Sequence, residues 1–296
     1  MARAHVLTAA VLFGTTGTAQ ALGPDLEPLA VGTARIVVGA ALLGAVALVA
    51  GRATLGHGDR RLVLLSGGFV AVYQAGFFAA VADTGVAVGT VVALGSAPAF
   101  TGVFGRVFAG ERLGRHWFAA TGLACGGVAL LTLGGASAGQ VSAPGVALAL
   151  LAGAGYAGYA VAGQRLLDQG GTPEAVMAAV FGTGAIILLP TLALTPSAGL
   201  LTTGGVTLAV YLGAVTTALA YILFARGLQQ IGASETATLT LAEPVTAMAL
   251  GFLVLGERPG VLAAAGAGLV LSGLVLLAVR PEPRSRPRPR LAENPA

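Results

Sequence analysis

Long apolar stretches follow one another along the whole chain, separated by short segments that carry most of its charged residues. They recur about every 25 to 30 residues, which matches about 20 residues for a bilayer crossing plus a short turn. Each stretch is continuously apolar rather than alternating, so the pattern predicts helices and not a membrane barrel. We expect an all-helical membrane protein of about ten transmembrane helices, at 6–22, 29–50, 62–82, 86–108, 116–134, 144–166, 174–194, 204–226, 233–255 and 261–279.

The composition agrees with a membrane protein. Hydrophobic residues make up 56% of the 296 residues and charged residues only 9%, whereas soluble domains carry roughly 25% charged residues. Lipid can cover such a surface, and water cannot. The single cysteine, Cys125, excludes an internal disulfide or a cysteine metal cluster, and His5, His57 and His116 are too scattered for a metal site. We therefore expect no metal and no cofactor.

The placement of the arginines predicts the orientation of the helices, because short cytoplasmic loops carry an excess of basic residues. With the N-terminus inside, the cytoplasmic arginines are Arg3, Arg52, Arg60, Arg61, Arg106, Arg112, Arg115, Arg165, Arg226 and those of the tail from Arg280 to Arg290. The outer loops hold Asp25, Glu27, Asp83 and Glu257, with Arg258 their only arginine. We expect a multi-pass protein of the plasma membrane with both termini in the cytoplasm. Membrane topology explains the basic residues, so no nucleic-acid partner is expected.

The two halves of the chain resemble each other at a fixed offset. Pro98 and Pro244 are 146 positions apart, as are Glu111 and Glu257, and the segment 67–131 lies over 213–277 without gaps. Each half holds five expected helices, so the second half enters the membrane from the opposite face. Such an inverted repeat allows one pathway to open alternately to either side.

The repeat divides the chain into four parts. We expect a first five-helix unit at 1–134, a linker at 135–143, a second five-helix unit at 144–280 and a tail at 281–296. The tail alternates proline and arginine and is predicted to be disordered and extended. It is either a solvated cytoplasmic anchor or a contact for anionic lipid headgroups.

A set of motifs occurs in order along both halves. The first half has Leu12-Phe13-Gly14, Tyr73-Gln74 followed by Phe77-Phe78-Ala79, Pro98, and Gly110-Glu111-Arg112 before a glycine-rich fifth helix; the second has Ala220-Tyr221 to Phe224-Ala225, Glu243-Pro244 and Gly256-Glu257-Arg258. With these motifs the chain resembles the EamA family of the drug/metabolite transporter superfamily over all but the tail. The resemblance implies ten helices, cytoplasmic termini and the movement, often export, of amino acids, related metabolites or drugs. Phe13 stands where the family usually has a tryptophan.

Two prolines fall near the centres of expected helices. Pro98 and Pro244 each remove one hydrogen bond of the helix ladder and displace the carbonyl four residues back, at Leu94 and Thr240. Carbonyls freed in this way must face protein or water. The prolines either kink their helices only, or also place carbonyls along a substrate pathway.

Three charged residues are candidates for contact with cargo. A charge in mid-helix costs about 2.5–3.5 kcal/mol on insertion scales, so Glu243 binds an ammonium group, exchanges a proton, or sits protonated in a structural hydrogen bond. Glu235 either shares its polar face or is solvated at a helix start. Arg35 either reaches to the interface or attracts a carboxylate. If Arg35 and Glu243 face one cavity, they would suit a zwitterion.

The remaining candidates for the substrate pathway are aromatic and polar side chains within the spans: Phe13, Tyr73, Gln74, Phe77, Thr90, Tyr156, Tyr159 and Tyr221. A buried tyrosine requires a partner for its hydroxyl, so each tyrosine is either a pathway residue or an interhelical or interfacial contact.

The sequence favours a small-solute transporter over three alternatives. An enzyme would need a nucleophile–base pair or a metal cluster at membrane depth, and the sequence suggests neither. A membrane scaffold or sensor would have no use for an inverted repeat. A sugar-phosphate or nucleotide-sugar exchanger would need several cations in its cavity, and Arg35 is the one candidate. The sequence does not distinguish proton exchange from uniport, or a monomer from a homodimer.

Overall fold

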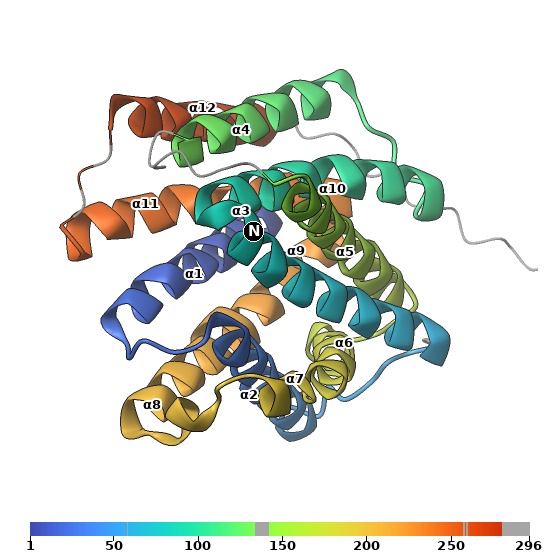
Figure 1. Ribbon diagram of the computed structural model, residues 1–296. Helices are drawn as coiled ribbons and strands as arrows, with labels where there is room; N and C mark the ends of the chain where they lie inside the picture. The colour runs from blue at the N-terminus through green and yellow to red at the C-terminus, as the bar shows by residue number, and fades with distance from the viewer. Residues whose placement is uncertain (58, 134–141, 257, 259, 280–296) are drawn as a thin grey trace, which may run out of the picture.

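The computed structural model describes residues 1–57, 59–133, 142–256, 258 and 260–279, and within these ranges it contains helices, turns and no strand (Figure 1). The predicted all-helical fold is confirmed. Most of the linker expected at 135–143, Glu257 and the tail expected at 281–296 lie outside the described residues.

The observed helices follow the expected apolar stretches closely. They are α1 (Ala2–Leu22), α2 (Pro28–Val49), α3 (Arg60–Phe108), α4 (Arg115–Leu133), α5 (Ala143–Asp168), α6 (Pro173–Leu188), α7 (Thr191–Leu194), η1 (Ala198–Leu201, a 3-10 turn), α8 (Thr203–Tyr211), η2 (Leu212–Leu219, π-helical), α9 (Ala220–Ile231), α10 (Ala233–Leu239), α11 (Ala242–Val254) and α12 (Val261–Val279). Within the described residues, 7 helical segments are long and apolar enough to cross a membrane, and Val261–Leu277 is a shorter apolar helix.

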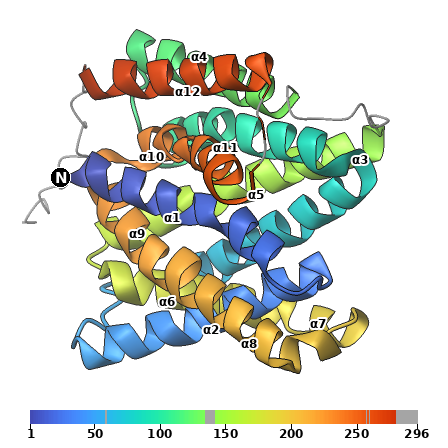
Figure 2. The ribbon, with the colours of Figure 1, turned by 90° about the vertical axis from the view of Figure 1, so that its left-hand side faces the viewer.

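Helix α3 is one helical run of 49 residues that doubles back on itself (Figure 2). The reversal lies between Thr84 and Gly89, and a Cβ at Gly89 would lie 3.1 Å from the backbone nitrogen of Val81. In a straight helix, positions eight residues apart are about 12 Å apart. The two arms of α3 are therefore the two spans expected at 62–82 and 86–108.

Capping side chains and prolines account for the starts of two long helices. Glu27 precedes α2, and its side chain accepts a hydrogen bond from the N–H of Ala30 at 2.8 Å. Thr172 precedes α6, and its hydroxyl accepts one from the N–H of Ala175. Each cap is followed by a proline, whose missing N–H has no helical partner to lose at that position.

Helices α4 and α12 pack against each other through reciprocal contacts. A Cβ on Gly127 would lie 2.5 Å from the backbone nitrogen of Val270, and a Cβ on Gly273 would lie 3.0 Å from that of Ala124. Small residues permit this close approach of two helix backbones. Because the position on α12 falls as the position on α4 rises, the two helices run antiparallel, and the loops that precede them lie at opposite ends of the pair.

The backbone before these two helices repeats as well. Gly110 and Gly256 each directly follow the C-cap residue of a helix. Their φ angles are +67° and +71°, a conformation that favours glycine. They are 146 positions apart in the sequence. Equivalent positions of the two halves therefore share their local backbone geometry and their helix packing.

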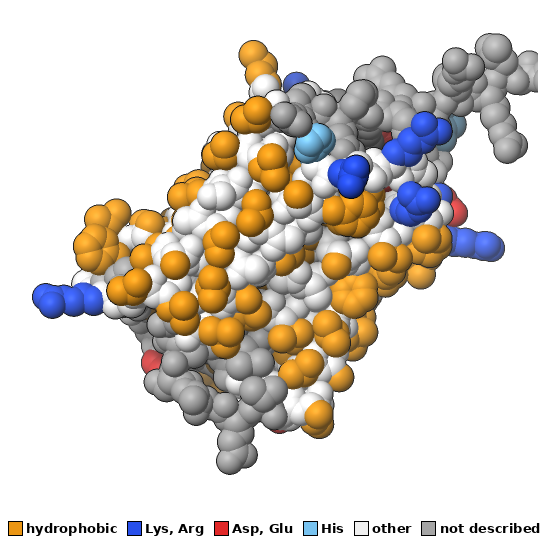
Figure 3. All heavy atoms as spheres, turned by 90° about the horizontal axis from the view of Figure 1, so that it is seen from above, with side chains coloured by type: hydrophobic (Ala, Val, Ile, Leu, Met, Phe, Trp, Pro, Cys, Tyr) orange, Lys and Arg blue, Asp and Glu red, His pale blue; other side chains and the backbone are white. Residues whose placement is uncertain are grey.

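The outer surface of the bundle is apolar. Leu253 on α11 is 73% exposed and Val275 on α12 is 60% exposed. Figure 3 looks down on the face that α4 and α12 cover, where hydrophobic and uncharged side chains occupy the middle and most basic side chains gather at one edge. Exposed apolar patches of this extent are typical of a surface that contacts lipid.

The two ends of the bundle differ in charge. The start of α1, the end of α2, the start of α6 and the end of α9 meet at one end (Figure 2), where Arg3, Arg52 and Arg226 form ion pairs. We call this the arginine end. The other end, where α2 and α8 begin, is called the opposite end.

Candidate functional site

Aromatic side chains from both halves of the chain meet in the interior of the bundle. The ring of Phe13 on α1 lies 4.9 Å from the ring of Tyr221 on α9. The rings of Tyr73 on α3 and Tyr156 on α5 lie 5.9 Å apart, and Tyr159 lies 6.1 Å from Tyr73 and 6.3 Å from Tyr221. These five residues, far apart in the sequence, form one cluster, which we call the aromatic centre.

Hydrogen bonds join the hydroxyls at the aromatic centre. The hydroxyls of Tyr156 and Thr240 lie 3.0 Å apart, and those of Tyr159 and Tyr221 lie 3.2 Å apart. Both tyrosines of α5 are at least nine-tenths buried. The partners that a buried tyrosine requires are thus supplied here by other helices.

Arg35 and Gln74 lie beside this centre. The Nη2 of Arg35 on α2 donates to Oε1 of Gln74 on α3 at 3.4 Å, and Gln74 is 2% exposed. Within the described residues, the buried Nε of Arg35 and Nε2 of Gln74 have no hydrogen-bond partner. Gly32, one turn before Arg35, leaves room for the amide, because a Cβ there would lie 2.3 Å from Nε2 of Gln74.

Glu243 lies in the first turn of α11 and is partly buried. Its carboxylate interacts electrostatically with the guanidinium of Arg35. No hydrogen bond or ion pair connects its carboxylate to another described residue. The backbone of Glu243 packs closely against α1, since a Cβ on Gly14 would lie 2.8 Å from the carbonyl oxygen of Glu243.

The prediction for Pro244 is wrong in one respect. Helix α10 ends at Leu239, and α11 begins after a break, so Pro244 stands in a first helical turn rather than in mid-helix. The carbonyl of Thr240 is not free, because it accepts a hydrogen bond from the N–H of Glu243 at 2.9 Å. Pro98 does lie inside a helix, α3, and the freed carbonyl of Leu94 stays a prediction.

Three further predicted residues lie away from the centre or at its edge. Glu235 is not simply solvated, because its Oε1 accepts from Nε of Arg3 at 2.6 Å and its side chain is 13% exposed. Phe77 lies at the edge, 6.3 Å from Tyr73 between ring centroids. Thr90 directly follows the reversal of α3, and no hydrogen bond in the described structure joins it to the aromatic centre.

Sequence reasoning did not include Phe181 of α6 among the candidates. Its ring lies 4.1 Å from that of Tyr221, closer than any other ring in the cluster, and it is 1% exposed. A single phenylalanine in an apolar helix carries no signal that distinguishes it from ordinary packing. The repeat could have drawn attention to Phe224, which lies 5.6 Å from Tyr221 and matches Phe78 in the first half.

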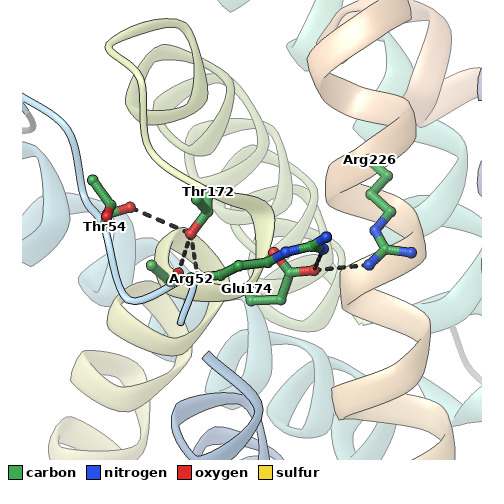
Figure 4. Close-up of polar contacts among 6 residues, drawn as sticks. Arg52, Thr54, Thr172, Glu174 and Arg226 are labelled. Atoms are coloured by element: carbon green, nitrogen blue, oxygen red, sulfur yellow. Dashed lines mark hydrogen bonds and ion pairs between the residues drawn. The ribbon is translucent and has the colours of Figure 1, made fainter. Parts of the chain in front are cut away.

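An ionic cluster connects three elements at the arginine end (Figure 4). Oε1 of Glu174 on α6 accepts from Nη1 of Arg52 at 3.0 Å and from Nη2 of Arg226 on α9 at 2.8 Å. The Glu174 side chain is 2% exposed. The hydroxyl of Thr172 donates to the carbonyl of Arg52, and its N–H donates to the carbonyl of Thr54 at 2.9 Å. We call Arg52, Glu174 and Arg226 the ionic clamp.

A second group of contacts at this end holds the start of α10. Oε1 of Glu111, in the loop before α4, accepts from the N–H of Ala233 at 2.8 Å, and Oε1 of Gln164 on α5 accepts from the same N–H at 2.7 Å. A carboxylate at a helix N-terminus is favoured by the helix dipole. The loop after α3 and the end of α5 are thus bound to α10.

The opposite end is held by different chemistry. The hydroxyls of Thr33 and Thr191 lie 2.9 Å apart, and a Cβ on Gly199 would lie 2.4 Å from the side chain of Leu26. Leu26 and Leu200 belong to one apolar cluster. The ion pairs Arg3–Glu235, Arg52–Glu174 and Arg226–Glu174 all lie at the arginine end. The arginine end is therefore held together by charges and the opposite end by apolar and hydroxyl contacts.

Comparison with known proteins now identifies the family. The model of the EamA-like transporter family matches the chain twice, over residues 4–133 and 143–279. The chain belongs to the EamA-like transporter family. The two matched ranges correspond to the two halves whose helices α4 and α12 pack reciprocally. Membership in this family and the apolar spans establish an EamA transporter in a lipid environment.

Similar proteins include further transporters. The chain is 38% identical over 277 residues to the uncharacterized transporter YwfM of Bacillus subtilis (strain 168), covering 93% of each. It is 31% identical over 189 residues to a probable terminal-alkyne amino-acid exporter of Streptantibioticus cattleyicolor, covering 61% of this chain and 60% of that one. One crystal structure, 22% identical, superposes with a TM-score of 0.82 over 94% of this chain and 96% of the other, which shows the fold.

Proposed function

We propose that this EamA-like transporter exports amino acids or related small metabolites by alternating access, in the plasma membrane with both termini in the cytoplasm. The observation that carries the proposal is the aromatic centre with the opposite charges of Arg35 and Glu243 beside it. Its residues come from α1, α2, α3, α5, α9 and α11, so both halves contribute to one place in the interior. A relative named as a probable amino-acid exporter supports the class of cargo.

The chemistry of this centre favours small organic cargo with both polar and apolar parts. Tyrosine and phenylalanine rings offer apolar contact and hydroxyls. Arg35 is the single cation among the residues described at the centre. A phosphorylated cargo, with two or more negative charges, would need more cations than this. The sugar-phosphate exchanger is therefore disfavoured, and apolar amino acids and drug-like cations fit better.

Alternating access requires each end to open in turn. We propose that the ionic clamp closes the pathway toward the cytoplasm in the conformation described here. Cargo then enters from the cytoplasm when Arg52 and Arg226 separate from Glu174. The apolar contacts at the opposite end, including Leu26 and Leu200, open in the other half of the cycle. Glu243, which has no partner at the centre, is the proposed carrier of a proton if export is coupled to one.

Counterflow in proteoliposomes tests this function. Purified protein is reconstituted in vesicles loaded with one unlabelled amino acid, and uptake of the same labelled amino acid is followed for L-leucine, L-phenylalanine and L-lysine. The proposal expects transient accumulation of at least one label above its equilibrium level. Empty vesicles and vesicles with the Glu243→Gln variant serve as controls. If none of the three amino acids accumulates, the proposed cargo class is wrong.

A further inference from the structure

Two buried hydrogen-bond donors at the centre of the bundle point to a missing acceptor. Nε of Arg35 and Nε2 of Gln74 are both buried and have no partner within the described residues. A guanidinium carries five donors and an amide carries two. Leaving such donors unpaired away from water is unfavourable, more so for a charged group. Two of them on neighbouring side chains are not explained by packing alone.

The contact between the two side chains positions them for one shared ligand. The Nη2 of Arg35 donates to Oε1 of Gln74 at 3.4 Å, which directs the amide nitrogen of Gln74 away from the guanidinium. Gly32 makes this arrangement possible, because any side chain there would collide with Nε2 of Gln74 and with the ring of Phe78. The acceptor side of Gln74 is thus used by Arg35, and its donor side stays available.

Glu243, the carboxylate that interacts electrostatically with Arg35, does not supply the missing acceptor. Glu243 attracts Arg35 electrostatically, yet its carboxylate forms no ion pair with another described residue. Glu243 therefore supplies no acceptor to the buried donors of Arg35 and Gln74. A cargo that meets both charges would present a negative group to Arg35 and a positive group to Glu243.

We propose that Arg35 and Gln74 form a binding subsite for the carboxylate of the cargo. The planar guanidinium suits a carboxylate through two parallel hydrogen bonds, and the amide N–H of Gln74 supplies a further donor. Glu243 then lies on the side where an ammonium group of the same cargo would bind. This subsite rests on the proposed function, which it deepens by stating which group of the cargo is recognised and by which residues.

Competition between an acid and its amide tests the subsite in the wild-type protein. Unlabelled L-leucine and L-leucinamide, which differ in the carboxylate, are compared as competitors of the labelled amino acid that shows counterflow. Loss of charge-assisted hydrogen bonds is expected to weaken the amide by about 10-fold to 100-fold. In Arg35→Gln this difference is expected to vanish, and Arg35→Lys is expected to keep part of it. Equal competition by acid and amide in the wild type would overturn the subsite while leaving transport itself established.

A measurement without cargo keeps the subsite testable even if no amino acid is transported. Gln74→Glu places a carboxylate of nearly the same shape beside Arg35. Because an uncompensated buried charge gains strongly from a partner, this variant is expected to raise the Tm of the purified protein by a few degrees. Gln164→Glu, a glutamine-to-glutamate change at a buried site without an arginine partner, is expected to lower it. If the Tm of Gln74→Glu does not rise, Arg35 does not need an anionic partner, and the proposal is wrong.

Discussion

Gly127 on α4 and Gly273 on α12 occupy equivalent positions in the two halves, and each packs directly against the backbone of the other helix. This reciprocal contact is what a two-fold axis between the two halves produces. It holds together the helices that end the two halves, remote from the aromatic centre. Because the two contacts are equivalent, the same substitution at either glycine is expected to have a similar effect on stability.

Gly127→Ala and Gly273→Ala are each expected to destabilise the protein by about 1–3 kcal/mol, because the added methyl meets backbone atoms that cannot move aside. The contacts would be 2.5 Å for Gly127 and 2.6 Å for Gly273. Thermal unfolding in detergent measures the effect. Gly122→Ala and Gly268→Ala are matched controls in the same two helices, since a Cβ at either position meets nothing within 4 Å. A large difference between the two test variants would contradict the two-fold relation.

Glu174→Gln is expected to favour the conformation that is open at the arginine end. The variant removes the charge that binds Arg52 and Arg226 together. A reporter cysteine from Ala160→Cys, at a buried position beside Tyr159, is placed in a Cys125→Ser background. Its reaction with a membrane-impermeant maleimide added from the arginine side should become several-fold faster.

Arg60→Gln serves as the control for the ionic clamp, because it changes the charge of the same end at an exposed position. It is expected to leave the labelling rate unchanged. An unchanged rate in Glu174→Gln would show that the clamp is a static structural contact and does not govern access.

Glu243→Gln is expected to reduce counterflow at least 10-fold while leaving the Tm close to that of the wild type. The physical reason is that the carboxylate makes no hydrogen bond or ion pair to another described residue, so the folded state loses only the electrostatic attraction to Arg35. A cargo ammonium, by contrast, loses a charged partner worth about 1.5–3 kcal/mol. Parallel measurements of counterflow and thermal unfolding separate the two effects. Full transport by this variant would remove Glu243 from the mechanism.

Much of the fold follows from the sequence because lipid imposes one simple rule. A backbone in lipid must satisfy its own hydrogen bonds, so apolar stretches become helices, and the expected spans agree with the observed helices to within a few residues. The repeat was visible in the sequence at Gly110 and Gly256. In the structure both residues have a positive φ angle. The side-chain contacts between helices could not be predicted from the sequence in the same way.

The contacts of individual side chains depend on distances that the sequence does not contain. Glu174 resembles any acidic residue in a first helical turn, and only the fold brings Arg52 and Arg226 to it. Thr240 was expected to offer a free carbonyl, but a break in the helix gave that carbonyl a donor three residues later. Arg35 was placed correctly within its helix, while its partner Gln74 could not be foreseen.

Labelling from the two sides of the membrane tests the inverted repeat most directly. Arg112→Cys and Arg258→Cys, each in a Cys125→Ser background, place single cysteines at equivalent positions before α4 and α12. Impermeant maleimide is added to intact cells or to inside-out vesicles. The account predicts that position 112 reacts only from the cytoplasmic side and position 258 only from the outside. Reaction of both positions from the same side would contradict it.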